Sequence, residues 1–157
     1  MPIETGQKAP DFSLFDNSKN KVSLYDYRDK NVLLLFFPLA FTSVCTKELC
    51  SVRDTISFYN ETNAQIFGIS VDSLYVLNKF REEQRLNFPL LSDFNKEASK
   101  AYDVLYEIFP PFNMHGVSKR AAFIVDKIGN IAYAEVCPTP ADIPNFNAIE
   151  QKVNSIS

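Results

Sequence analysis

Cys45 lies at the junction between an apolar run and a helical pattern, where a cysteine becomes a good nucleophile. The residues before it, 31–37, read N-V-L-L-L-F-F, which is typical of a strand buried on both faces of a sheet. Pro38 ends this run, and the apolar residues that follow recur at helical spacing, with Thr42 or Ser43 as the expected N-cap. Cys45 is therefore expected in the first turn of a helix, where unpaired N–H groups and the helix dipole favour a thiolate.

A thiolate at this position has the chemistry to attack an O–O bond, provided that nearby groups stabilise the departing oxygen. Thr42 places a hydroxyl three residues before Cys45, and the backbone N–H groups around Val44 complete the expected pocket. Arg120 offers a permanent cation with several N–H donors if its strand end lies beside the helix start. Each residue also has a simpler explanation, because buried cysteines, helix caps and solvated arginines are all common.

The pattern P-x-x-x-T-x-x-C, formed by Pro38, Thr42 and Cys45, resembles the active-site signature of the peroxiredoxins. Arg120, in the segment K-R-A-A-F-I-V-D, matches a further position of that family, and the resemblance covers nearly the whole chain. The resemblance implies that the proline shields the thiolate and that the threonine and arginine orient the peroxide. It also implies that the cysteine becomes a sulfenic acid.

Two further residues, Glu48 and Cys50, take expected roles from the same resemblance. Glu48 matches a position where relatives often carry a glutamate or glutamine that holds the arginine. The helix dipole alone also explains a glutamate in the first turn of a helix.

Cys45 and Cys50 are five positions apart. In an intact helix this spacing corresponds to about 7.5 Å of rise and about 140° of rotation, so a disulfide between them requires the helix to unwind. The C-x-x-x-x-C spacing resembles the Q-type peroxiredoxins, also called bacterioferritin comigratory proteins, in which the second cysteine resolves the first. We therefore expect Cys50 to be the resolving residue, with a core cysteine as the alternative.

Other features keep alternative mechanisms open. The T-K-E-L after Cys45 and the Y-A-E-V at 133–136 resemble the one-cysteine alkyl hydroperoxide reductase E type, which lacks an obligatory internal partner. Cys137 is expected to be a structural or fortuitous thiol, with an intermolecular bridge as the alternative. His115, the only histidine, is expected to be a polar loop residue rather than a metal ligand. A thioredoxin-fold disulfide reductase would normally present C-x-x-C, and a binding module would function without Cys45.

The elements that must position these residues alternate between strands and helices. This order implies parallel pairing with a right-handed crossover, and it resembles the thioredoxin core. We expect one α/β domain over residues 1–157, with a thioredoxin-like fold, a central mixed sheet, helices on both faces and an N-terminal β-hairpin. The sequence predicts a hairpin around 16–20, strands over 32–37 and 64–71, helices over 46–59, 73–85 and 95–102, a hairpin of 121–126 with 131–136, and a helix over 144–156.

Length, composition and charge narrow the class of protein. The chain has 157 residues, of which 46% are hydrophobic, and a net charge of −3, which fits a compact enzyme and gives no field that would attract nucleic acid. The longest apolar run, 32–41, is too short for a membrane span, and the first residues lack an export signal, so the cytosol is expected.

The resemblance also implies the partners of the protein. A peroxiredoxin is a thiol peroxidase that reduces hydrogen peroxide or organic hydroperoxides, needs no cofactor or metal, and is recycled by a thioredoxin-like protein or another dithiol donor. The apolar residues of the 109–116 loop are expected to join Leu39 and Phe41 in a homodimer surface, as corresponding loops do in many peroxiredoxins. These loop residues are Phe109, Pro110, Pro111 and Phe112.

Overall fold

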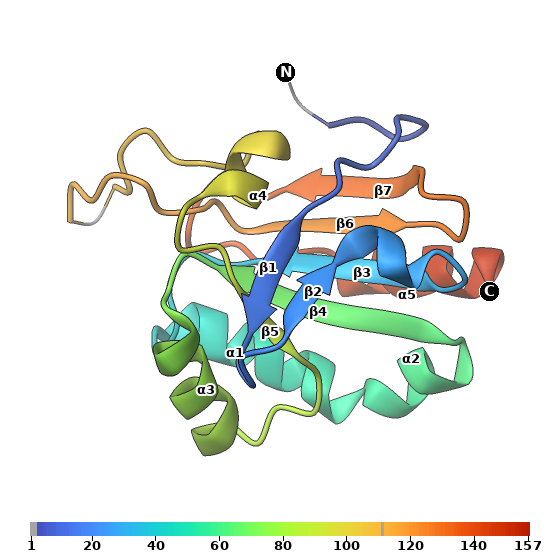
Figure 1. Cartoon of the computed structure of the whole chain (residues 1–157), viewed down its shortest axis with the longest axis horizontal. Coiled ribbons are helices and arrows are strands. Elements are labelled where there is room, and N and C mark those ends of the chain that lie inside the picture. The colour runs from blue at the N-terminus through green and yellow to red at the C-terminus, as the bar shows by residue number, and fades with distance from the viewer. Residues whose placement is uncertain (1–2, 111) are drawn as a thin grey trace.

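A computed structural model describes residues 3–110 and 112–157, and Figure 1 shows a twisted sheet with helices packed against it. Within these residues, seven strands form one sheet in the order β2-β1-β5-β4-β3-β6-β7. The strands are β1 (Ser13–Asp16), β2 (Lys21–Ser23), β3 (Asn31–Phe36), β4 (Ala64–Ser70), β5 (Leu90–Ser92), β6 (Ala121–Val125) and β7 (Ile131–Val136). The helices are the 3₁₀ helix η1 (Leu24–Tyr27), α1 (Ser43–Asp54), α2 (Ile56–Glu61), α3 (Leu74–Glu83), α4 (Glu97–Ala101) and α5 (Phe146–Ile156).

Strand β3 organises the sheet because it pairs on both sides. It runs parallel to β4 and antiparallel to β6, and all of its residues are buried, as the apolar run predicts. Successive side chains of a strand point to opposite faces. Residues 33 and 35 therefore enter the core on one face of the sheet, and residues 32, 34 and 36 enter the core on the other.

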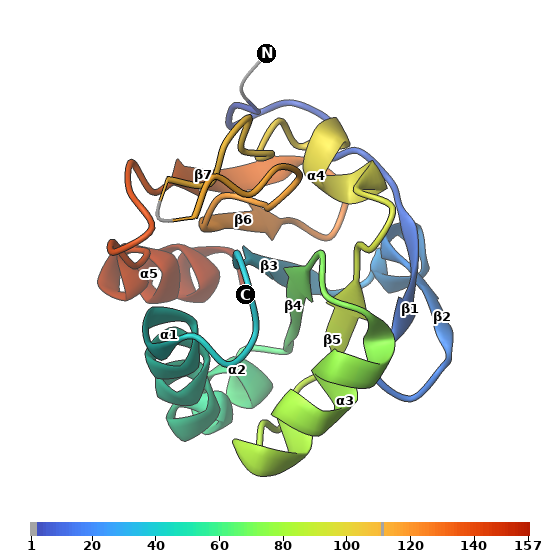
Figure 2. The ribbon, with the colours of Figure 1, turned by 90° about the vertical axis from the view of Figure 1, so that its left-hand side faces the viewer.

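Helices cover both faces of the sheet, as Figure 2 shows. Helices α1, α2, α3 and α5 bury Leu49, Tyr59, Phe80 and Ile149 on one face. The short helices η1 and α4 lie against the other face, where Leu24 and Ala98 are buried. The predicted mixed sheet, its helical layers and the N-terminal hairpin of β1 and β2 are thus confirmed. The single domain over residues 1–157 stays a prediction, and the shared sheet supports it.

The predicted helix over 46–59 is wrong in its extent, because it is divided into α1 and α2 at Thr55. Thr55 has φ −112° and ψ 19°, and its N–H bonds the carbonyl of Val52 three residues earlier. Its hydroxyl also donates to the carbonyls of Ser51 and Val52. These local bonds compete with the helical pattern and turn the chain before α2 begins.

Two short elements, η1 and β5, escaped sequence-based prediction. Strand β5 has three residues and is recognisable only by its pairing with β1 and β4. The described helices are all shorter than the roughly 20 residues that a bilayer requires, and in the described part of the chain no helix combines the length and apolar character of a membrane span.

Candidate active site

The start of α1 presents Cys45 as the third residue of the helix, as predicted. Thr42 occupies the N-cap position in an extended conformation, but the expected capping bond from its side chain is absent. The Thr42 hydroxyl instead donates to the carbonyl of Leu39 at 2.8 Å. The Thr42 carbonyl accepts the first helical bond from the N–H of Thr46 at 3.0 Å. No acceptor among the described residues bonds the N–H of Val44 or Cys45, so both donors can serve an anion or a peroxide.

Asp72 fixes the loop between β3 and α1, a role that the sequence analysis missed. Its Oδ2 accepts a hydrogen bond from the N–H of Ala40 at 2.8 Å and another from the hydroxyl of Ser70 at 2.7 Å. Asp72 does not cap the following helix; Ser73 caps α3, by accepting from the N–H of Val76. A polar residue just after a parallel strand was the available signal, since loops at the carboxyl ends of such strands commonly build sites.

Arg120 links the two acidic groups of the site. Its Nη1 lies 3.1 Å from the Cys45 Sγ and donates to Oε1 of Glu48 at 2.8 Å, while its Nη2 donates to the Pro140 carbonyl at 3.1 Å. Cys45, Glu48 and Arg120 are 1%, 0% and 2% exposed. The structure therefore brings together three of the predicted site residues in a buried cluster that is almost closed to water.

The pairing of β6 with β3 explains how Arg120 reaches Cys45 across 75 positions of sequence. Ala121 pairs with Phe36 in the antiparallel register, so that the residue before β6 lies beside the end of β3. The chain enters α1 from this same end. The carbonyl of Arg120 is held in turn by the N–H of Cys137 at 2.9 Å.

Burial dominates the ionisation of Glu48. It raises the pKa of this carboxyl from 4.5 to about 7, although the Arg120 guanidinium opposes the shift. Burial also opposes ionisation of Arg120, yet the neighbouring Glu48 carboxylate and Cys45 sulfur raise the pKa of this guanidinium above its ordinary value. The single guanidinium of Arg120 thus contacts both Glu48 and Cys45. When Glu48 is protonated, its carboxyl no longer neutralises this positive charge, which then acts on Cys45 alone.

Glu48 is expected to make the folded protein less stable as the pH rises. Because the pKa of Glu48 is about 7 when folded and 4.5 in the reference state, the folded protein binds this proton more tightly. The resulting stabilisation is complete below about pH 4.5 and is lost as the pH rises through about 7, a change of up to about 3 kcal/mol. Denaturant unfolding of the wild type and Glu48→Gln from pH 5 to pH 8 measures it. A difference between the two proteins that is independent of pH would contradict the prediction.

The dipole explanation of Glu48 is wrong, because the residue does not lie in the first turn. Helix α1 begins at Ser43, and its first turn contains no acidic residue. The contact with Arg120 accounts for the buried position of Glu48 and agrees with the holding role that the resemblance implies. Oε2 of Glu48 and Nε of Arg120 are buried and have no hydrogen-bond partner among the described residues, so each of them can still form one more hydrogen bond.

The three cysteines of the chain are all free. Cys50 is half-buried, and its Sγ donates to Oε1 of Gln84 at 3.6 Å, away from Arg120. Cys137 is buried after β7, and burial, together with the nearby Glu135 carboxylate, raises the pKa of its thiol to about 12. A thiol with such a pKa stays protonated at neutral pH, which supports the structural role expected for Cys137.

His115 lies outside the pocket, as expected for a loop residue. Its Nδ1 lies 3.0 Å from the carbonyl of Glu107, and its side chain is exposed. Over residues 3–110 and 112–157, no group of three or more histidine, cysteine or acidic residues could hold a metal ion.

The prediction that Phe109 contributes to a dimer surface is wrong. Phe109 is buried and packs on Tyr106, with ring centroids 5.6 Å apart. Phe112 and Phe41 are exposed, by 74% and 48%. Pro111 lies outside the described residues. The homodimer stays a prediction, which sedimentation of the protein would test.

Together, the fold and the site define a class of protein. A buried cysteine at a helix start, beside an arginine and at the end of a central strand, is the arrangement required by a thiol-dependent peroxidase.

Comparisons with known proteins identify the family. The model of the AhpC/TSA family matches residues 5–134, and the chain belongs to this family. It is 37% identical over 132 residues to the peroxiredoxin Bcp of Bacillus subtilis, covering 83% of each chain. It is 38% identical over 137 residues to the alkyl hydroperoxide reductase E of Mycobacterium bovis, covering 85% of this chain and 86% of the relative. The crystal structure of the peroxidoxin BcpB from Mycobacterium tuberculosis has a TM-score of 0.87 and 27% identity, with 99% of each chain covered.

These similarities confirm the thioredoxin-like peroxiredoxin fold and the resemblance on which the sequence analysis relied. The chain is a peroxiredoxin, a thiol-dependent peroxidase. Both subgroups that the sequence resembles, the Bcp type and the alkyl hydroperoxide reductase E type, occur among its relatives.

Proposed function

We propose that Cys45 is the peroxidatic cysteine, which reduces hydrogen peroxide and organic hydroperoxides. The observation that carries this assignment is the 3.1 Å contact between the Cys45 Sγ and Nη1 of Arg120. The Cys45 thiolate attacks the terminal oxygen of the peroxide, so that an S–O bond forms and the O–O bond breaks. The sulfur becomes a sulfenic acid, and the departing hydroxide or alkoxide takes a proton to leave as water or an alcohol.

The neighbouring residues supply the charge and the donors that this step needs. Arg120 stabilises both the thiolate and the developing oxyanion. The Thr42 hydroxyl donates its hydrogen bond to the carbonyl of Leu39, so the lone pairs of its oxygen can accept a hydrogen bond from the O–H of the peroxide. Pro38 is buried at the end of β3 and shields the sulfur, while Glu48 holds the guanidinium through its 2.8 Å bond.

Cys50 is proposed to resolve the sulfenic acid. Its thiolate attacks the Cys45 sulfur, an S–S bond forms, and the S–O bond breaks with release of water after protonation. The intact helix separates the two cysteines, so the segment between them must unwind in every catalytic cycle. The product is an intramolecular disulfide, for which a thioredoxin-like protein or another dithiol is the proposed reductant. The odd number of cysteines fits a reducing compartment, and a cytosolic location is proposed on this ground.

The resolving role of Cys50 predicts the product that one equivalent of peroxide leaves on the reduced protein. Peptide mapping by mass spectrometry should find a Cys45–Cys50 bridge and a free Cys137 in the wild type. Cys50→Ser should react with peroxide at an unchanged rate and then stop at the Cys45 sulfenic acid, because burial keeps the one remaining thiol, Cys137, protonated. Cys137→Ser is the matched control and should behave as the wild type.

A second candidate mechanism is favoured by the relative named alkyl hydroperoxide reductase E. In that case an external thiol reduces the Cys45 sulfenic acid directly, and Cys50 takes no part. A lasting sulfenic acid in the wild type, or a Cys45–Cys137 bridge, would contradict the role of Cys50. A lasting sulfenic acid would establish the one-cysteine mechanism instead.

A further inference from the structure

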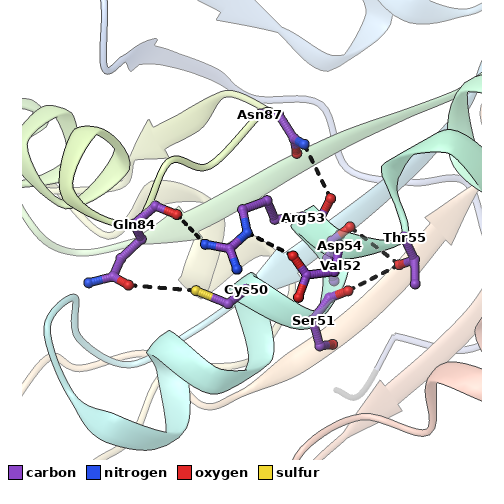
Figure 3. A network of polar contacts seen from close by, with 8 residues as sticks. All are labelled: Cys50, Ser51, Val52, Arg53, Asp54, Thr55, Gln84 and Asn87. Atoms are coloured by element: carbon purple, nitrogen blue, oxygen red, sulfur yellow. Dashed lines mark hydrogen bonds and ion pairs between the residues drawn. The ribbon is translucent and has the colours of Figure 1, made fainter.

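The carboxyl-terminal half of α1 is bound to the segment that connects α3 with β5, as Figure 3 shows. Nη1 of Arg53 donates to the carbonyl of Gln84 at 2.5 Å. Nδ2 of Asn87 donates to the carbonyl of Arg53 at 3.2 Å. These two hydrogen bonds, named here the Arg53 anchor, fix the last turn of α1 through both the side chain and the backbone of one residue.

The two halves of α1 are therefore held by different parts of the protein. Arg120 binds the first half through Cys45 and Glu48, and the Arg53 anchor binds the second half. Cys50 lies at the border between the halves, with its thiol directed to Oε1 of Gln84, the same residue whose carbonyl receives Arg53 (Figure 3).

Formation of a Cys45–Cys50 bridge divides the helix at this border. The residues between the cysteines must unwind, and what remains of α1 after them is Cys50–Asp54, a segment of about one and a half turns. An isolated helix of this length is not stable in water, because the cost of nucleation is not recovered by so few bonds. The remaining turns persist only if tertiary contacts hold them.

We propose that Arg53 is a positioning residue for the resolving step. The Arg53 anchor keeps the end of α1 folded while residues 43–49 unwind, so that Cys50 stays in place and the mobile Cys45 is brought to it. This inference rests on the proposed Cys45–Cys50 mechanism and adds the residue that fixes one of the two reacting sulfurs. The bond from Cys50 to Gln84 breaks when the Cys50 thiol loses its proton and attacks the sulfenic acid.

An Arg53→Met variant tests the proposal, since methionine keeps an unbranched side chain and removes every donor. The reaction of Cys45 with hydrogen peroxide should keep its rate, because Arg53 does not contact Cys45. The disulfide should form about tenfold more slowly, the scale of one lost hydrogen bond from a charged donor. More Cys45 should consequently be oxidised to sulfinic acid when peroxide is in excess.

Arg81→Met is the matched control. Nε of Arg81 donates to the carbonyl of Phe88 at 3.1 Å, so this arginine binds a carbonyl within the same connecting segment, whereas Arg53 joins that segment to α1. Its loss should lower the stability of the protein and leave the rate of disulfide formation unchanged. A purely structural effect of Arg53 would appear equally in both variants.

Hydrogen exchange of the disulfide form provides a second readout. Peptides from residues 43–49 should lose protection on oxidation, while peptides from 51–54 keep it in the wild type and lose it in Arg53→Met. Should Arg53→Met not fold, Asn87→Ala removes the bond to the Arg53 carbonyl and should slow disulfide formation in the same direction.

Unchanged or faster disulfide formation in these variants would overturn the role of Arg53. If the wild type forms no Cys45–Cys50 bridge, the proposed resolving mechanism fails first. The two failures are therefore distinguishable.

Discussion

Arg120→Met is expected to lower the rate of peroxide reduction by about 10²–10³-fold, the scale for loss of a preorganised donor to a developing oxyanion. The guanidinium contacts the Cys45 Sγ at 3.1 Å, and both residues are almost fully buried. Its loss removes both the cation beside the sulfur and the donor for the departing oxygen. Rapid mixing of the reduced variant with hydrogen peroxide measures the effect. Lys119→Met, which removes the neighbouring cation that lies over the Tyr106 ring, should retain the wild-type rate.

The same variant is also expected to be less stable, which a double variant separates from the loss of rate. Removing Arg120 leaves the Glu48 carboxyl buried without its partner, at a cost of about 1–3 kcal/mol, the scale of an unsatisfied buried polar group. Changing both residues to methionine removes the unpaired carboxyl, so most of the stability should return in denaturant unfolding. The rate of peroxide reduction should remain low. A double variant that regained the rate would show that Arg120 acts through folding alone.

Cys45→Ser is expected to reduce peroxide turnover to the uncatalysed level, a loss on the order of 10⁶-fold, as when a catalytic nucleophile is removed. A serine hydroxyl is not ionised near neutral pH, so neither the helix start nor Arg120 can convert it into a nucleophile. The smaller oxygen fits the buried position, and the variant should therefore fold. Rapid mixing of the fully reduced proteins with hydrogen peroxide measures the loss.

Cys137→Ser is the control for this experiment and should react as the wild type does. A Cys45→Ser protein that reduced peroxide at the normal rate would disprove the peroxidatic role of Cys45. The activity would then have to reside on one of the other two thiols.

Local patterns predicted the elements around the site well. The apolar run at 31–37 is the buried strand β3, and Cys45 lies in the first turn of the following helix. The hairpin of β6 and β7 also agrees with its sequence, and Asp126 closes the turn by accepting from the N–H groups of Ile128 and Asn130. Such features depend on residues within a few positions of one another, and the sequence contains that information directly.

The errors arose where a side chain had more than one possible partner. The Thr42 hydroxyl bonds the carbonyl of Leu39 instead of capping α1. The hydroxyl of Thr55 bonds the carbonyls of Ser51 and Val52, where the chain leaves α1. Short polar side chains can satisfy the backbone in several local geometries, and spacing along the sequence does not choose among them.

The sequence by itself determined the family, the reactive cysteine and the element that presents it, because a strand, a turn and a helix start are local structures with local signals. Only the tertiary structure decided which distant groups meet that element. The pairing of β3 with β6 places Arg120 on Cys45, and the packing of α3 beside α1 places Gln84 on Cys50. These contacts join residues that are 75 and 34 positions apart. Strand register and helix packing set them, and both follow from burial of the whole core rather than from any local pattern.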